Sequence, residues 1–304
     1  MVILGAYMSF INIHGLIDKI AVGLGAKFIP KYFRESIDSQ GFDEHLQNVS
    51  LELPEVKAEG DYELSAATLV GELQAAFRLV QWRGERCSSV IYHHGANEIP
   101  FDYGFRRIFS LKRGDIPLNL FLVRAPFHRS MKEFQQGIRV FANFIAMLAV
   151  SVHLIEQLVQ YNKKHSTGQI LVAGTSLGGF ITNLHHIHYN SADFYTPLLA
   201  GTAMDDAFLH SVYSRAVAKH AKENSAAISS VLNFEEEFKA ADNSNVFPLL
   251  ARFDEIIRYE LQKASYGNRP VVTINKGHTT GALSYEYLRQ HILKFLPGNV
   301  GIKT

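Results

Sequence analysis

The segment that most constrains the fold is Gly174-Thr175-Ser176-Leu177-Gly178, a G-x-S-x-G sequence. An apolar run of strand type, residues 170–173, comes before it, and a segment compatible with a helix follows it. This order is typical of a strand that turns sharply into a helix and holds the serine hydroxyl out at its carboxyl end. The flanking glycines suit such a turn because it is crowded. The sequence therefore predicts that Ser176 lies at the rim of a sheet.

Apolar runs of strand type recur along the chain, and from residue 118 onward a helical pattern separates most of them. The runs cover residues 51–56, 77–82, 88–92, 118–123, 169–173, 196–200, 246–252 and 270–274. This alternation favours a mostly parallel sheet with helices on both faces, an α/β fold. The sequence has no Pro/Gly-rich linker and no internal repeat, which favours one large domain. We expect that domain at residues 50–304, after an amino-terminal apolar helical segment at residues 1–49.

Two longer helical segments are expected between these runs. The first opens with Ser130-x-x-Glu133, a capping-box pattern, and closes with basic residues up to His165, so we expect one long helix. Its uncharged stretch, residues 140–155, is too short to span a bilayer. The second segment, residues 202–245, is polar and helical in character. We expect it to form peripheral helices or a small cap over the site.

Three polar side chains are expected to meet at the rim of the sheet. Serine is a weak nucleophile, so Ser176 needs a base, and the base needs an acid that orients it. Asp254 comes directly after the seventh apolar run, and His278 comes after the last one. Groups that follow parallel strands converge on one edge of a sheet. Asp205 and Asp206, which follow the run at residues 196–200, are alternative candidates for the acid.

The chain order Ser176, Asp254, His278 resembles that of the α/β-hydrolase superfamily, and of its serine esterase and lipase branch in particular. The resemblance implies an α/β-hydrolase fold in which Ser176 is the nucleophile. It also implies that His278 is the general base and then the acid, and that Asp254 holds the imidazole. Some members take the acid from the preceding strand, which keeps Asp206 and Asp205 as alternatives.

The resemblance covers roughly residues 50–296 and extends to a second motif upstream, the pair His94-Gly95 at the end of a strand-like run. Hydrolases of this fold often place His-Gly here, so that the next backbone N–H points at the carbonyl oxygen of the substrate. The oxyanion hole implied by this likeness is the N–H of Ala96 with the N–H of Leu177. Each such donor contributes on the order of 3 kcal/mol to catalysis. His94 itself is expected to be structural, with its ring bonded to neighbouring backbone.

The reaction that this resemblance implies is the cleavage of a carboxylic ester or thioester through an acyl-enzyme intermediate. The expected substrate is a small-molecule ester or a lipid-like one, and no cofactor is needed. An acyltransferase that uses the same three residues is one alternative, and a non-catalytic binding module on the same fold is another. Dehalogenase and epoxide-hydrolase chemistry is disfavoured, because both use an aspartate where this chain has Ser176.

The composition excludes several other classes of function. Lys and Arg number 30 against 29 Asp and Glu, so no charge imbalance points to nucleic acid as a partner. Cys87 is the only cysteine, which rules out an internal disulfide and favours a reducing, cytoplasmic location. Three histidines, His185, His186 and His188, lie close together near a helix end, but no H-E-x-x-H or ligand-spaced carboxylate accompanies them. We therefore expect no metal site.

The amino terminus is apolar, and residues 1–10 contain no charged side chain. Neither the basic region nor the cleavage site of a signal peptide is clear in it, and Asp18 and Lys19 interrupt the apolar run before about 20 residues accumulate. We therefore expect neither a signal peptide nor a membrane span here. Its apolar residues recur at helical spacing. They are Phe10, Ile13, Ile17, Ile20 and Leu24. Residues 1–25 are thus expected to form a helix that packs on the body of the protein or contacts a membrane surface or a partner.

Overall fold

The computed structural model describes residues 12–28, 30–110 and 116–296, so the first part of the predicted amino-terminal helix, residues 1–11 with Phe10, lies outside the described residues. Within these ranges the strands form one eight-stranded sheet, in the order β1-β2-β4-β3-β5-β6-β7-β8. The strands are β1 (Gly60–Thr68), β2 (Gly71–Gln81), β3 (Ser88–His93), β4 (Leu118–Arg124), β5 (Ile170–Thr175), β6 (Phe194–Leu198), β7 (Leu249–Ala251) and β8 (Val272–Ile274). The pairs β1–β2 and β2–β4 are antiparallel, and the five pairs from β4 to β8 are parallel.

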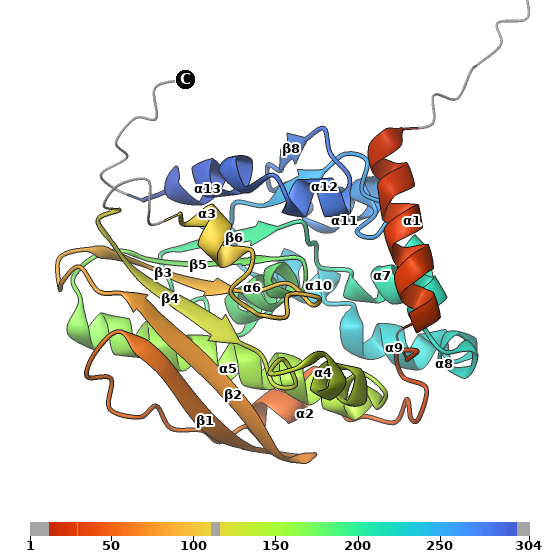
Figure 1. Ribbon diagram of the computed structural model, residues 1–304, viewed down its shortest axis with the longest axis horizontal. Helices are drawn as coiled ribbons and strands as arrows, with labels where there is room; N and C mark the ends of the chain where they lie inside the picture. Colours follow the sequence, from red (N-terminus) through yellow and green to blue (C-terminus); the bar gives the residue numbers. More distant parts are fainter. Residues whose placement is uncertain (1–11, 29, 111–115, 297–304) are drawn as a thin grey trace, which may run out of the picture.

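Helices cover both faces of the sheet, as the sequence predicts, and each face has its own apolar core (Figure 1). The larger core lies under α5 (Phe141–His165) and α6 (Leu177–His188). The smaller core lies under α3 (Phe105–Ile108) and α13 (Tyr285–Leu293). The expected fold class, a mostly parallel sheet between two layers of helices, is therefore confirmed.

The strand expected at residues 51–56 is absent from the described structure, and that prediction is wrong. Pro54 stands in the middle of this run and has no N–H to give to a ladder, so the run stays irregular. The first strand of the sheet is instead β1, which alternates buried and exposed residues and pairs with β2. A tight turn joins the two strands at Gly71, where φ is +101°. The run expected at residues 77–82 is the second half of β2.

The single helix expected between Ser130 and His165 is also wrong, because the structure divides it into α4 (Met131–Gly137) and α5. Ser130 caps α4, since its hydroxyl accepts the N–H of Glu133 at 3.2 Å. The chain then becomes extended at Val140, which forms a β-bridge with Ser36. Helix α5 is long and apolar enough to cross a membrane, but 78% of its most apolar window is buried inside this fold. Its apolar character therefore serves the core beneath the sheet.

The remaining helices include α1 (Ile13–Phe28) and those of residues 202–245. Helix α1 packs against η2 (Val212–Ala216) and α12 (His278–Ala282), at one side of the molecule (Figure 1). Residues 202–245 also contain α7 (Met204–Leu209), α8 (Lys219–Glu223), α9 (Ser225–Leu232) and α10 (Glu235–Ala240). In the chain, α11 (Tyr259–Ser265) follows β7. Helix α2 (Phe42–Gln47) packs on α5. The division of the chain into residues 1–49 and 50–304 stays a prediction.

Candidate active site

Ser176 lies at the sharp turn between β5 and α6, where the sequence places it. Its backbone is in a conformation that L-residues rarely adopt, with φ +57° and ψ −113°. The turn is so tight that a Cβ on Gly178 would come within 2.2 Å of the carbonyl oxygen of His93. A Cβ on Gly174 would come within 2.3 Å of the backbone of Gly178. Glycine is therefore required on both sides of the serine.

The structure brings Ser176, His278 and Asp254 together in one chain of hydrogen bonds. His278 Nε2 lies 2.9 Å from Ser176 Oγ, and His278 Nδ1 lies 2.7 Å from Asp254 Oδ2. The second carboxylate oxygen, Oδ1, accepts the N–H groups of Ile256 at 2.8 Å and Ile257 at 2.7 Å. A carboxylate held in this way accepts the proton on Nδ1, so Nε2 is left to accept the hydroxyl proton of the serine.

The charges around His278 favour this arrangement. Burial lowers the pKa of the imidazole, but the charge and the hydrogen bond of Asp254, together with the charge of Asp18, raise it, and the net pKa lies above the ordinary value. Burial raises the pKa of Asp254, although the charge and hydrogen bond of His278 oppose that shift. The buried carboxylate thus stabilises the imidazolium that forms when His278 takes a proton.

The two alternative acids have other partners. Asp206 forms an ion pair with Arg258, whose Nε lies 2.9 Å from Asp206 Oδ2. Asp205 Oδ2 accepts the hydroxyl of Ser229 at 2.6 Å. Since Asp254 is the carboxylate bonded to His278, the geometry favours it over both.

The loop after β3 lies beside Ser176. A Cβ on Gly95 would be 3.8 Å from the Ser176 Cβ, and Ala96 and Leu177 both line the cavity at the serine. The N–H of Gly95 is bonded to Glu98 at 3.1 Å, which anchors the loop. This arrangement places the loop where the sequence predicts an oxyanion hole.

Two histidines hold this loop from behind. His94 Nδ1 donates to the carbonyl of Gly95 at 2.8 Å and its Nε2 accepts the N–H of Ala125 at 3.1 Å, so its predicted structural role is confirmed. The sequence alone does not indicate a role for His128. Its Nε2 lies 3.0 Å from the carbonyl oxygen of Ala96 and its Nδ1 lies 2.9 Å from that of Pro126. In the sequence, His128 is a histidine a few residues after a strand end, and many structural histidines stand in such a position.

A cavity of about 250 Å³ opens at Ser176 and His278, and its wall is mostly apolar and aromatic. Its apolar lining residues are Tyr32, Ala96, Phe144, Leu177, Phe180, Met204, Ala207, Phe208, Tyr213, Ile256, Ile257, Ala282 and Leu283. A second cavity of about 150 Å³ adjoins it, because both are lined by Tyr32, Tyr213 and His278. The second cavity reaches α1 at Val22, so α1, α7 and η2 contribute walls to the two cavities.

The three histidines of α6 have separate protein partners. His185 Nε2 lies 3.0 Å from Glu156, His186 Nε2 lies 3.1 Å from the carbonyl of Asp242, and His188 faces Asp43. Among the described residues no group of three His, Cys, Asp or Glu side chains could hold a metal ion.

Comparison with known proteins supports the fold. No protein-family model matches this chain, and no curated protein sequence matches it. The structure is similar to that of Pyrococcus horikoshii acylaminoacyl peptidase, with a TM-score of 0.51, 11% identity, and coverage of 79% of this chain and 41% of that chain. It is also similar to acetyl xylan esterase from Paenibacillus sp. R4, with a TM-score of 0.50, 12% identity, and coverage of 93% and 94%. The chain thus spans less than half of the peptidase, and at these identities the similarity establishes the architecture alone.

Proposed function

Because this chain has the α/β-hydrolase fold, we propose that it is a serine hydrolase that cleaves carboxylic ester or thioester bonds through an acyl-enzyme intermediate. The observation that carries the proposal is the hydrogen-bond chain from Ser176 through His278 to Asp254. This chain begins at a strained turn and faces an apolar cavity, so the serine has both a base and room for a substrate.

The proposed mechanism follows from these contacts. His278 Nε2 takes the hydroxyl proton while Ser176 Oγ attacks the acyl carbon. The N–H groups of Ala96 and Leu177 stabilise the oxyanion that forms. The imidazolium then gives its proton to the departing alcohol or thiol, and the acyl group stays on Ser176. Water, deprotonated by the same nitrogen, releases the acid and restores the serine.

The cavity supports an apolar acyl group as the substrate portion bound next to Ser176. Aromatic rings from four elements line it, among them Phe144, Phe180, Phe208 and Tyr213. Rings of this kind bind alkyl or aryl groups by apolar burial, worth about 25 cal/mol per Å² removed from water. A lipid-like ester fits such a wall better than a charged or strongly polar substrate.

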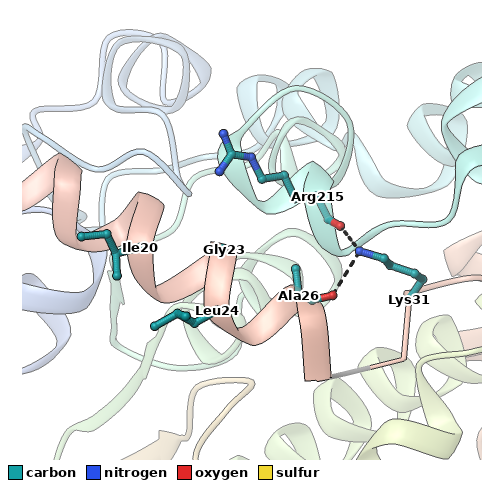
Figure 2. A pocket seen from close by; sticks show the side chains of 6 residues that line it. All are labelled: Ile20, Gly23, Leu24, Ala26, Lys31 and Arg215. Atoms are coloured by element: carbon teal, nitrogen blue, oxygen red, sulfur yellow. Dashed lines mark hydrogen bonds between the residues drawn. The ribbon is translucent and has the colours of Figure 1, made fainter.

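The exposed side of α1 supports a contact with a lipid surface. Ile13, Leu16, Ile20 and Leu24 are 66%, 42%, 51% and 57% exposed, an arrangement that soluble surfaces avoid. Figure 2 shows Ile20 and Leu24 beside a groove between α1 and η2, with Arg215 on its other wall. A basic group next to an apolar stripe is attracted to anionic lipid headgroups. We therefore propose a cytoplasmic protein that attaches peripherally to a membrane through α1.

The experiment that tests the hydrolase proposal combines fluorophosphonate labelling with hydrolysis of p-nitrophenyl esters from acetate to palmitate. We expect wild type to label and to turn over, and Ser176→Ala and His278→Ala to lose both activities. Labelling without turnover on any ester would contradict the proposed substrate class and leave the nucleophile standing. Absence of both in wild type would favour a non-catalytic binding module. Turnover that rises with added alcohol, with transfer of the acyl group to it, would identify an acyltransferase.

A further inference from the structure

One carboxylate of α1 reaches the two loops that carry the acid and the base. Asp18 is fully buried. Its Oδ2 accepts the N–H of His278 at 2.7 Å and that of Glu255 at 3.3 Å, and its Oδ1 accepts the N–H of Thr279 at 2.9 Å. Asp254 is adjacent to Glu255 in the chain, so this single side chain ties together the segment after β7 and the turn after β8. A buried carboxylate is costly unless hydrogen-bonded, and here three backbone donors satisfy it.

The surrounding sequence is adapted to this close contact. A Cβ on Gly277 would lie 2.7 Å from Asp18 Oδ2 and 2.7 Å from the carbonyl oxygen of His14. On the helix side, a Cβ on Gly15 would lie 3.0 Å from Glu255 Oε1. Glycines on both sides therefore let α1 approach the two loops. Figure 1 shows α1 standing beside α12, whose first residue is His278.

We propose that Asp18 is a positioning residue that holds the backbone of His278 so that its imidazole meets both Ser176 and Asp254. The inference rests on the proposed function, because positioning matters only if His278 acts as the base. Asp18 contacts backbone N–H groups and not the reacting atoms, so its effect on the reaction passes through His278. A shift of about 1 Å at a reacting group can cost on the order of a hundredfold in rate.

The charge of Asp18 gives the proposal a measurable signature. Burial lowers the pKa of His278, but the charge and hydrogen bond of Asp254 and the charge of Asp18 raise it above its ordinary value. His278 must be neutral to act as a base. Loss of the Asp18 charge lowers the pKa of His278, so the activity lost on acidification is lost at a lower pH than in wild type. A residue that only stabilised the fold would not move this pH profile.

The test compares Asp18→Asn and Asp18→Glu with Ile228→Ala, a control that trims a buried apolar residue of α9 that lines neither cavity. In Asp18→Asn an NH₂ group faces a backbone donor, so we expect kcat to fall by about 10- to 100-fold with little change in KM. We also expect the loss of activity on acidification to shift to lower pH. Asp18→Glu keeps the charge, so it should lose activity at the same pH as wild type although its kcat falls. Ile228→Ala is expected to lower thermal stability without shifting the acidic side of the pH profile.

The outcomes separate this inference from the proposed function. If wild type hydrolyses esters and folded Asp18→Asn matches it in kcat and in pH profile, the positioning role is refuted and the hydrolase proposal stands. If wild type neither labels nor hydrolyses, the proposed function fails. NMR titration of the His278 ring then tests, without any substrate, whether Asp18 acts on His278. A lower pKa of His278 in Asp18→Asn would then support the contact, and an unchanged one would refute it. If Asp18→Asn does not fold, an unchanged kcat in Asp18→Glu would refute the positioning role.

Discussion

Asp254→Asn is the substitution whose effect the structure defines most closely. The Oδ1 atom of Asp254 accepts two backbone N–H groups, from Ile256 and Ile257. Turning the amide NH₂ toward these donors would break two hydrogen bonds, and bonds to a charged acceptor are worth about 1.5–3 kcal/mol each. The asparagine oxygen therefore occupies the Oδ1 position, and the NH₂ faces His278 Nδ1.

This orientation imposes the wrong tautomer on His278. Because the NH₂ is a donor, Nδ1 has to accept, and the ring proton moves to Nε2. An N–H at Nε2 faces Ser176 Oγ and cannot take its proton. The loss expected for this tautomer is on the order of 10⁴ in kcat, which corresponds to about 5 kcal/mol of transition-state stabilisation.

The assay is hydrolysis of p-nitrophenyl butyrate, with thermal unfolding to show that each variant is folded. Asp206→Asn is the matched control, because it replaces a buried carboxylate that is paired with Arg258 rather than with His278. We expect Asp206→Asn to stay within about tenfold of wild type in kcat. The reasoning is refuted if Asp254→Asn keeps more than about a tenth of wild-type kcat, or if Asp206→Asn suffers the larger loss.

Three further predictions concern the base, the turn and the oxyanion loop. The pKa of His278 is raised, so kcat/KM should be full above that pKa and decline as pH falls through it, with a midpoint above about 6.5; a midpoint well below this value would contradict the contacts described. Gly178→Ala should lower the melting temperature strongly, because its Cβ would lie 2.2 Å from a carbonyl oxygen of β3. Gly41→Ala, whose Cβ would have no atom within 4 Å, should leave the melting temperature nearly unchanged, and equal melting temperatures for the two variants would be evidence against the tight turn. His128→Ala should lower kcat by about tenfold or more and change KM little, because His128 holds the Ala96 peptide that we propose to face the oxyanion; a change confined to KM would argue against that role.

The fold and the central three residues could be predicted because their signals are local. Ser176 lies in a motif of five residues, and Asp254 and His278 each follow an apolar strand, so their order along the chain specifies their meeting at the rim. The strand predicted at residues 51–56 rests on the apolar residues of that run, but the structure has no strand there because Pro54 has no N–H to donate to a neighbouring strand. The break at Val140 was missed because it depends on a bridge to Ser36, about a hundred residues upstream.

Asp18 could not have been found in this way. In the sequence it is a charged residue that interrupts an apolar segment, and that reading says only that the segment does not span a membrane. Its three donors lie at least 237 positions further along the chain, in loops that have no pattern of their own. Only the packing of α1 against the ends of β7 and β8 brings them together, so the role is a property of the tertiary structure.

The final prediction compares substitutions on the exposed and the buried face of α1, and it separates membrane contact from positioning of the base. Replacing Ile13, Ile20 and Leu24 with serine removes exposed apolar area and leaves Asp18 buried, so this variant should lose sedimentation with anionic phospholipid vesicles and keep its rate on a short soluble ester. Asp18→Asn should show the reverse, since it changes the buried face alone. If the triple variant lost its activity on the soluble ester while still folded, the two faces would not be independent. Undiminished sedimentation of the triple variant would show that the stripe is not the lipid contact.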